Sequence, residues 1–307
     1  MNMKRIHTFS ILVLVLSLSG LTLSAQTSAE GNEAFGVLRV DRDPVRLGMA
    51  GAGESMTSQN QAFAAFGNPA AAAFSSSKVE TGVSYASWAP HYAGAGNIAS
   101  GVTGHVNEKV VLSVGFARQG YPGLDIEPSS SFKPSDVLLR AGAGIAFTES
   151  FSLGVTAGYA KEALMSDYSL SAFSVTAMAQ YRVAGLNVAA GVAHLGGKVG
   201  DGYPLPSSVK LAADYGLDFE NIALRAALDA DYYFSENYSV AAGLDLGIGG
   251  AGFLRGGYRY ASKGAAIPSF LGLGGGARFA GFELDFAFLM ASESLSGTWM
   301  AGLSYRF

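Results

Sequence analysis

The sequence contains no cysteine, few charged residues and no run rich in lysine and arginine. The lack of cysteine excludes a disulfide framework, a thiol enzyme and a zinc site with thiolate ligands. Acidic residues (24) outnumber basic ones (20), which does not favour a general nucleic-acid-binding protein. Charged residues make up only 14% of the 307 residues, against roughly 25% in ordinary soluble domains. Aromatic residues, at 11%, are too frequent for a disordered chain.

The first 25 residues have the pattern of a secretory signal peptide. Lys4 and Arg5 precede an uncharged run of apolar and small residues, 11–23, and Ala25 or Ala29 would complete a cleavage site. A membrane-spanning helix is the alternative, but the run is short for one and no stop-transfer pattern follows it. We therefore predict that this peptide is removed and that the protein leaves the cytoplasm. No cysteine is present to accept a lipid, so the chain is not expected to be a lipoprotein.

Apolar and polar residues alternate through the rest of the chain. In 222–234, Leu224 and Leu228 share one face of a strand while Arg225 and Asp229 lie on the other. Repeated segments of about ten residues with this pattern are typical of an outer-membrane β-barrel. Closing the sheet pairs every backbone N–H and C=O group, as lipid requires. We therefore predict an all-β fold, a 14-stranded antiparallel transmembrane barrel.

The predicted strands number fourteen, an even number as expected for a bacterial single-chain barrel. Their connections are short at one end and longer at the other, except for the short link Ser235-Glu236, and this parity supports the count. The strands are predicted near residues 79–88, 94–106, 109–118, 136–147, 151–162, 170–182, 185–194, 207–217, 222–234, 237–248, 251–261, 270–279, 281–291 and 297–307.

A soluble β-sandwich with inward apolar faces is the alternative all-β fold. Two features count against it. Large apolar side chains occupy one face of nearly every strand, and aromatic residues gather toward strand ends, where interfacial girdles lie in membrane barrels.

The faces predicted to line the lumen carry equal numbers of charges of each sign. This balance favours ion pairs that span a narrow lumen over a ring of one sign that would select ions. Inward glycines would leave room for a packed element. The alternative is that the glycines only mark bends in the strands and that the charges are solvated. The charges are Arg140, Arg182, Lys210, Arg225, Arg255, Arg259 and Arg278 against Glu80, Asp214, Asp229, Asp231, Asp245, Glu283 and Asp285; the glycines are Gly142, Gly144, Gly154, Gly158, Gly272, Gly274 and Gly276.

The chain therefore divides into a signal peptide (1–25), an N-terminal segment (26–78) and the barrel (79–307). The segment is too long for a linker and too apolar for an exposed tail, and it lacks strand alternation. We predict that it folds into the barrel as a hatch. At the other end of the chain, Gly302, Tyr305 and Phe307 match the C-terminal signal that the barrel-assembly machinery reads.

Two motifs in the segment carry a resemblance to a known family. Arg46-x-Gly48-Met49-x-Gly51 is followed by a further glycine, and then by Asn68-Pro69-Ala70. Followed by fourteen strands, these motifs resemble the FadL-type barrels, and within them the PorV/PorQ family of type IX secretion. The resemblance implies the hatch and a place in the outer membrane of a Gram-negative bacterium, with lipid as its surroundings.

The sequence predicts no enzyme, cofactor or metal site. The run 247–252 spells G-x-G-x-x-G, but it falls at a turn between two predicted strands with no helix after it. After removal of the signal peptide the histidines are His91, His105 and His194, each isolated. A histidine–serine pair at His194 is conceivable, but an interfacial ring explains this residue more simply.

Two functions are compatible with the resemblance. The PorV/PorQ likeness implies a non-enzymatic component of protein secretion that binds a secretion translocon or the sorting domains of its cargo. The loop 119–135 is the candidate binding surface, through Tyr121, Leu124, Ile126 and Phe132, unless this loop folds over the barrel mouth. The FadL likeness implies instead an outer-membrane channel for the uptake of small hydrophobic molecules.

Overall fold

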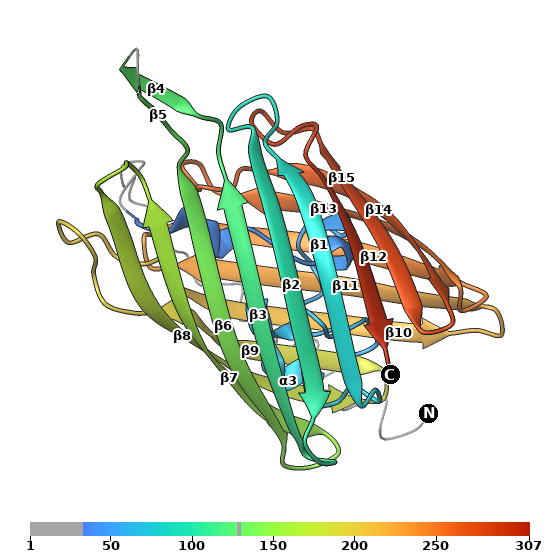
Figure 1. Cartoon of the computed structure of the whole chain (residues 1–307). Helices are drawn as coiled ribbons and strands as arrows, with labels where there is room; N and C mark the ends of the chain where they lie inside the picture. Colours follow the sequence, from blue (N-terminus) through green and yellow to red (C-terminus); the bar gives the residue numbers. More distant parts are fainter. Residues whose placement is uncertain (1–32, 128–129) are drawn as a thin grey trace.

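Fourteen antiparallel strands form a closed barrel (Figure 1). The structure is a computed structural model that describes residues 33–127 and 130–307; the predicted signal peptide lies outside the described residues. In the described part, no helix is long and apolar enough to span a membrane. The barrel strands are β1 (Val79–Trp88), β2 (Ala95–His105), β3 (Val110–Gly120), β6 (Ser135–Ala146), β7 (Phe151–Ala163), β8 (Ser169–Val183), β9 (Leu186–Leu195), β10 (Ser208–Asp218), β11 (Ile222–Tyr233), β12 (Tyr238–Ile248), β13 (Gly252–Ala261), β14 (Phe270–Phe279), β15 (Phe282–Met290) and β16 (Trp299–Arg306).

Each barrel strand falls on one of the predicted strands, with ends that differ by a few residues. The barrel closes where β1 pairs with β16, from Glu80 opposite Arg306 to Ser87 opposite Trp299. Two further strands, β4 (Leu124–Glu127) and β5 (Ser130–Phe132), form a separate hairpin within the connection from β3 to β6. The sequence predicts a loop at 119–135, because strands this short show no clear alternation.

The two ends of the barrel differ in their connections. The connections from β2 to β3, β6 to β7, β8 to β9, β10 to β11, β12 to β13 and β14 to β15 are all short. They lie at the end where β1 begins and β16 finishes, which we call the turn end. The other end, called the loop end, carries the long connections and the β4–β5 hairpin, which projects beyond the strands in Figure 1.

The outer surface of the barrel is apolar. Along β12, Val240 and Leu244 are exposed, whereas Ala241 and Asp245 on the opposite face are buried. The same alternation recurs along β7, where every second residue from Ser152 to Ala160 is buried. A soluble sandwich would bury these apolar faces against a second sheet. The sandwich alternative is therefore wrong, and the exposed apolar wall is the surface that lipid stabilises.

The wall is irregular where β8 meets β9. The pairing shifts register between Val175 and Ala177, and His194 has a φ of 57°. A bulge of this kind redirects a side chain. His194 is only 9% exposed and contacts Arg140 inside the barrel, so its prediction as an interfacial ring is wrong.

Candidate functional site

The described part of the N-terminal segment, residues 33–78, lies inside the barrel. These residues are called the segment from here on. Near its start, the Ala34 N–H donates to the Pro204 carbonyl at the loop end (3.0 Å). At its finish, the Lys78 N–H donates to the Phe307 carbonyl at the turn end (3.3 Å). The segment therefore runs the length of the lumen. It contains η2 (Gly36–Arg39), α2 (Pro44–Gly48), η3 (Ala64–Phe66) and α3 (Pro69–Ala72).

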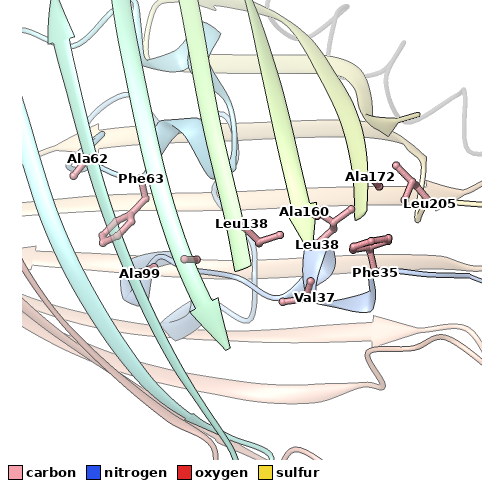
Figure 2. Close-up of a cluster of buried hydrophobic side chains, with 11 residues drawn as sticks. Phe35, Val37, Leu38, Ala62, Phe63, Ala99, Leu138, Ala160, Ala172 and Leu205 are labelled. Carbon is pink, nitrogen blue, oxygen red and sulfur yellow. The ribbon is translucent and has the colours of Figure 1, made fainter. Parts of the chain in front are cut away.

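The start of the segment packs against the wall near the loop end. Phe35, Val37 and Leu38 are buried in a cluster with inward residues of β6, β7 and β8. Figure 2 shows the Leu38 side chain next to Ala160 and Leu138. These apolar contacts replace the water that would otherwise fill this part of the lumen, and so stabilise the segment within the barrel.

The Asn68-Pro69-Ala70 motif begins α3 and fastens it to the wall. The Asn68 side-chain oxygen accepts from the N–H groups of Ala70 (3.0 Å) and Ala71 (3.3 Å), as an N-cap residue does. Its amide group donates to the Gln180 side-chain oxygen of β8 (2.9 Å). Pro69 at the first helical position needs no partner for its nitrogen. The motif is thus a short capped helix bonded to the barrel.

The Arg46-to-Gly51 motif forms the end of α2 and the tight turn after it. The Gly51 N–H donates to the Arg46 carbonyl (2.8 Å), and Gly51 has a φ of 89°, which a glycine adopts without strain. Gly48 packs against Gly274 of β14, and the fully buried Met49 packs against glycines of β12 and β13. These residues therefore seat the segment against the wall.

Several glycines of the wall face the segment at van der Waals distance. A Cβ atom on Gly272 of β14 would lie 2.6 Å from the Leu47 carbonyl oxygen. A Cβ atom on Gly302 of β16 would lie 2.7 Å from Cγ of Pro44. Gly144 and Gly154 face α3 in the same way, whereas Gly142, Gly158 and Gly276 lie closest to residues of the wall itself. Most of the predicted inward glycines therefore make room for the segment.

Gly243 of β12 offers a matched test of this packing. A Cβ atom there would lie 2.6 Å from Met49 Cβ, whereas one on Gly247 of the same strand would meet Ala223 Cβ at an ordinary 3.5 Å. We expect Gly243→Ala to destabilise the folded barrel by about 1–3 kcal/mol through overpacking. Gly247→Ala should leave stability nearly unchanged. Urea midpoints of the folded barrel in detergent measure both, and equal midpoints would contradict the packing.

A chain of ion pairs joins the segment to the wall. Glu54 pairs with Arg46 of the segment (2.9 Å) and with Lys210 of β10 (3.2 Å). Lys210 also pairs with Asp231 of β11 (3.0 Å), which lies 3.8 Å from Arg259 of β13. Each charge is buried or nearly so, and each has an opposite partner, which is the arrangement that makes buried charges tolerable.

The backbone next to Glu54 is held as well. The N–H groups of Gly53 (3.0 Å) and Glu54 (2.9 Å) both donate to the Asp229 carboxylate of β11. The Ser55 hydroxyl donates to Asp214 of β10 (2.7 Å). Hydrogen bonds to a charged acceptor are among the stronger ones in proteins. Residues 53–55 are therefore the part of the segment with the densest polar anchoring.

The remaining lumen charges pair along the wall and not across the lumen as predicted. Arg255 of β13 contacts Asp245 (3.1 Å) and Asp285 (2.5 Å), which lie on neighbouring or nearby strands. Arg278 pairs with Glu283 on the adjacent strand (2.7 Å). The predicted spanning geometry is wrong for these charges, because the segment occupies the space between opposite walls.

Three further lumen charges are also placed differently from the prediction. Arg225 reaches Asp218 at the turn end (2.6 Å), where the carboxylate side chain is 70% exposed. Arg182 lies over the Phe74 ring of the segment, 4.1 Å from its centre. The Glu80 carboxylate of β1 accepts from the Gln61 N–H and the Ser75 hydroxyl, so it also binds the segment.

The environment of the segment shifts the pKa values of its charged groups. Burial alone would raise the pKa of Glu54, but Arg46 and Lys210 hold it below its ordinary value. Burial and the neighbouring Asp41 raise the pKa of Asp43 to about 7. Burial and Arg140 lower the pKa of Arg42 to about 9. The segment thus combines a well-paired carboxylate with two groups for which burial disfavours the charge.

The Asp43 carboxyl makes stability depend on pH. Its pKa is 3.8 in its ordinary state and about 7 when folded, so the folded state binds more protons between these values. The folded state should therefore lose stability as the pH rises through this window, by up to about 1.4 kcal/mol per pH unit. Asp43→Asn keeps the oxygen that caps α2 and should flatten this slope. Melting of the folded barrel at pH 5 and pH 8 measures it; identical profiles for both proteins would contradict it.

A cavity of about 100 Å³ lies between the segment and the wall. Trp88, Ile267 and Phe270 line it from the loop end of the barrel. Behind them is an apolar cluster with Leu289 and Met300. The rest of the lining is mostly polar and comes from the segment and β9 to β13, with Arg39, Asp41, Arg42, Asp43, Arg46, Glu54, Asn60, Gln61, His194, Ser208, Lys210, Asp231, Tyr233 and Arg259.

The residues predicted for partner binding are described only in part. Tyr121 is half-buried; its hydroxyl donates to Asp136 (2.9 Å) and its ring packs against the apolar cluster. Phe132 is also half-buried. The side chains of Leu124 and Ile126 lie outside the described part of the chain. Tyr121 therefore faces the barrel mouth, and its use by a partner stays a prediction.

The C-terminal residues predicted as an assembly signal lie on and after β16. The Tyr305 ring packs on Phe282 (4.5 Å between centres) and on Phe307 (4.5 Å). Phe307 itself is 66% exposed. An exposed aromatic edge is accessible to the assembly machinery, and recognition by it stays a prediction.

Comparison with solved structures decides the fold type. A Pseudomonas aeruginosa FadL homologue superposes with a TM-score of 0.52 at 15% identity, covering 87% of this chain and 96% of its own. The CymD monoaromatic hydrocarbon channel gives 0.62 at 13% identity, covering 89% and 98%. The Pseudomonas putida toluene transporter TodX gives 0.62 at 13%, covering 86% and 98%. This is the fold of the FadL-type barrels.

Comparison of sequences does not assign the chain to a family within the FadL-type fold. No protein-family model and no curated protein matches the chain. The structural likeness at 13–15% identity concerns the fold alone. It supports the FadL part of the resemblance and provides nothing specific to the PorV/PorQ family.

The sequence did not predict the role of the buried charged residues of the segment. Glu54 and Arg42 are 4% and 2% exposed, yet neither belongs to the motifs that were singled out. Their signal was available, because a charge within an apolar segment that is predicted to be enclosed needs a partner. Their partners come from strands far along the chain, so pairing could not be read from spacing.

Proposed function

We propose that this protein is a non-enzymatic channel of the outer membrane that admits small hydrophobic molecules, with the N-terminal segment as an internal gate. The observation that carries the proposal is the FadL-type barrel enclosing this segment. CymD and TodX, which share the fold, are described as a monoaromatic hydrocarbon channel and a toluene transporter. A turn end facing the periplasm and a loop end facing outward follow from the usual orientation of such barrels.

The loop end supports the entry of an apolar molecule. Trp88, Ile267 and Phe270 form the outward side of the cavity, and the apolar cluster lies around them. Transfer of an apolar molecule from water to such a surface is favourable, at about 25 cal/mol per Å² of buried apolar surface. The molecule then meets the polar inner side of the cavity and the buried residues of the segment.

The segment is suited to act as a gate because much of its anchoring is polar. Ion pairs at Glu54 and hydrogen bonds at Asp229 hold it to β10 and β11. Polar contacts can be exchanged for water when the segment shifts, at a smaller cost than exposure of an apolar core. At the turn end, Thr57 and Ser58 of the segment border an open space of about 460 Å³. Movement of residues 53–61 would join this space to the cavity.

An uptake assay tests the proposed function. Cells that lack the protein should take up radiolabelled toluene several-fold more slowly than cells that produce it, and the chain supplied from a plasmid should restore the rate. A hydrophilic solute of similar size serves as the control and should enter equally fast in all strains. Equal toluene uptake with and without the protein would contradict a channel for apolar molecules.

A second candidate, a platform for protein secretion, is favoured by one feature. The β4–β5 hairpin projects beyond the loop end (Figure 1), where it could bind a secretion translocon or a cargo sorting domain. The PorV/PorQ resemblance implies such partners. Crosslinked pull-down from outer membranes, with a chain lacking residues 122–133 as control, tests it. Recovery of the same proteins by both chains would argue against binding through the hairpin.

A further inference from the structure

Arg42 is a buried cation without a carboxylate partner. Its side chain is 2% exposed, and the Val37 carbonyl accepts one hydrogen bond from Nη2 (3.0 Å). The Nε and Nη1 atoms have no hydrogen-bond partner, and Arg42 forms no ion pair within the described residues. A guanidinium has five N–H donors, and leaving them unsatisfied away from water is costly. The site therefore lacks an acceptor.

A second buried arginine increases this deficit. Arg140 of β6 is 5% exposed, its Nη2 contacts Nδ1 of His194 (2.9 Å), and its Nε has no partner. It too forms no ion pair in the part of the chain that the structure describes. Burial and the charge of Arg140 lower the pKa of Arg42 to about 9, and the opposite effect of Asp41 and Asp136 does not compensate for them. Two buried cations that repel each other are stabilised if an anion lies near them.

The cavity that Arg42 and His194 line offers the space for an anion. Three more arginines line it, Arg39, Arg46 and Arg259, and in each the Nε is buried without a hydrogen-bond partner. Four carboxylates also line the cavity. Glu54 and Asp231 are paired with Arg46, Lys210 or Arg259. Asp41 lies 3.6 Å from Arg46, and Asp43 accepts from the Val45 N–H (2.9 Å). The unsatisfied atoms around the cavity are therefore mainly donors.

The size of the cavity limits what can bind. Its volume is about 100 Å³. A water molecule occupies about 30 Å³, and a cavity of about 150 Å³ is known to hold benzene. The space therefore fits about three waters or one compact ion while the segment stays in place, and an aromatic ring enters it only when residues 53–61 move.

We propose that this cavity binds a small oxyanion, held by the buried Arg42 guanidinium. The planar guanidinium donates two parallel hydrogen bonds to an ion with two or more oxygens, a geometry that a spherical ion cannot use. Inorganic phosphate and a short carboxylate share this chemistry. The ion would bridge the segment and the wall on the polar inner side of the cavity, whose outward side is the apolar entry proposed for the channel.

Titration of the folded, full mature barrel in non-ionic detergent tests the site. The protein is dialysed into chloride, and phosphate or acetate is added at constant ionic strength while binding is followed by calorimetry. We expect saturable binding of at least one of the two ions. Binding of phosphate alone identifies a phosphate-type ligand, whereas binding of acetate identifies a carboxylate. Lack of saturable binding of both, or equal binding of chloride, would overturn the proposal.

Substitutions locate the ion. Arg42→Gln should weaken binding at least about tenfold, since hydrogen bonds to a charged group are lost. Arg42→Lys keeps the charge without the planar fork, should also bind more weakly, and is the variant to measure if Arg42→Gln fails to fold. The exposed Arg118 of β3 provides the matched control, and Arg118→Gln should bind as the wild type does. Unchanged affinity in the Arg42 variants would show that the ion binds elsewhere. Toluene uptake is a separate readout, so its loss or survival does not decide this site.

Discussion

Replacing Glu54 by glutamine is expected to destabilise the folded barrel by about 3 kcal/mol. The Glu54 carboxylate is buried between Arg46 (2.9 Å) and Lys210 (3.2 Å), and removing its charge leaves two cations facing each other. Breaking a buried ion pair by removing one partner typically costs about 3–5 kcal/mol. We place the effect at the low end because Lys210 keeps Asp231 as a partner (3.0 Å). The temperature at which the folded band disappears from a gel measures the change.

A matched control shows whether the loss of stability is specific to Glu54 or follows the replacement of any glutamate. Glu149 lies exposed in the turn between β6 and β7, so Glu149→Gln should leave the melting temperature unchanged. The double variant Glu54→Gln, Lys210→Met should recover part of the lost stability, because it removes one of the two cations that face each other once the Glu54 charge is lost. If the Glu54→Gln and Glu149→Gln barrels lose their folded band at the same temperature, the ion-pair chain does not hold the segment.

The barrel could be predicted from the sequence because its rule is local. Leu244 and Asp245 belong on opposite faces by strand geometry alone, and the structure exposes the first and buries the second. The parity of short and long connections then fixes which strands pair. Inward glycines such as Gly272 indicated space for an enclosed element, and this space is occupied by the segment.

Other features depend on partners that spacing cannot show. Arg225 was expected to pair across the lumen, but the structure places it beside Asp218 at the turn end. The bulge beside Val175 turns His194 inward, and a single extra residue in a strand leaves almost no trace in an alternating pattern. The pairing of Glu54 with Lys210 joins residues far apart in the chain, so the sequence indicated a charge in need of a partner without identifying it.

A reversible disulfide between the segment and the wall is expected to reduce toluene uptake at least about tenfold. Ala62 of the segment is fully buried, and a Cβ atom on Gly82 of β1 would lie 3.1 Å from its Cβ. Disulfides need about 3.5–4.5 Å between Cβ atoms, so a small shift admits the bridge in Ala62→Cys, Gly82→Cys. The natural chain has no cysteine to compete. If the segment must leave the wall for a molecule to pass, the oxidised variant holds the channel closed.

The controls make this experiment decisive for the gate. Each single cysteine variant adds one of the two side chains without a bridge, and should transport toluene equally well before and after oxidation. Reduction of the double variant should restore uptake to the level of the single variants. Normal uptake through a barrel whose bridge has been demonstrated by a shift in gel mobility would show that the segment stays in place during transport. The molecule would then pass along the wall of the lumen, and the ion pairs at Glu54 would serve to fix the segment.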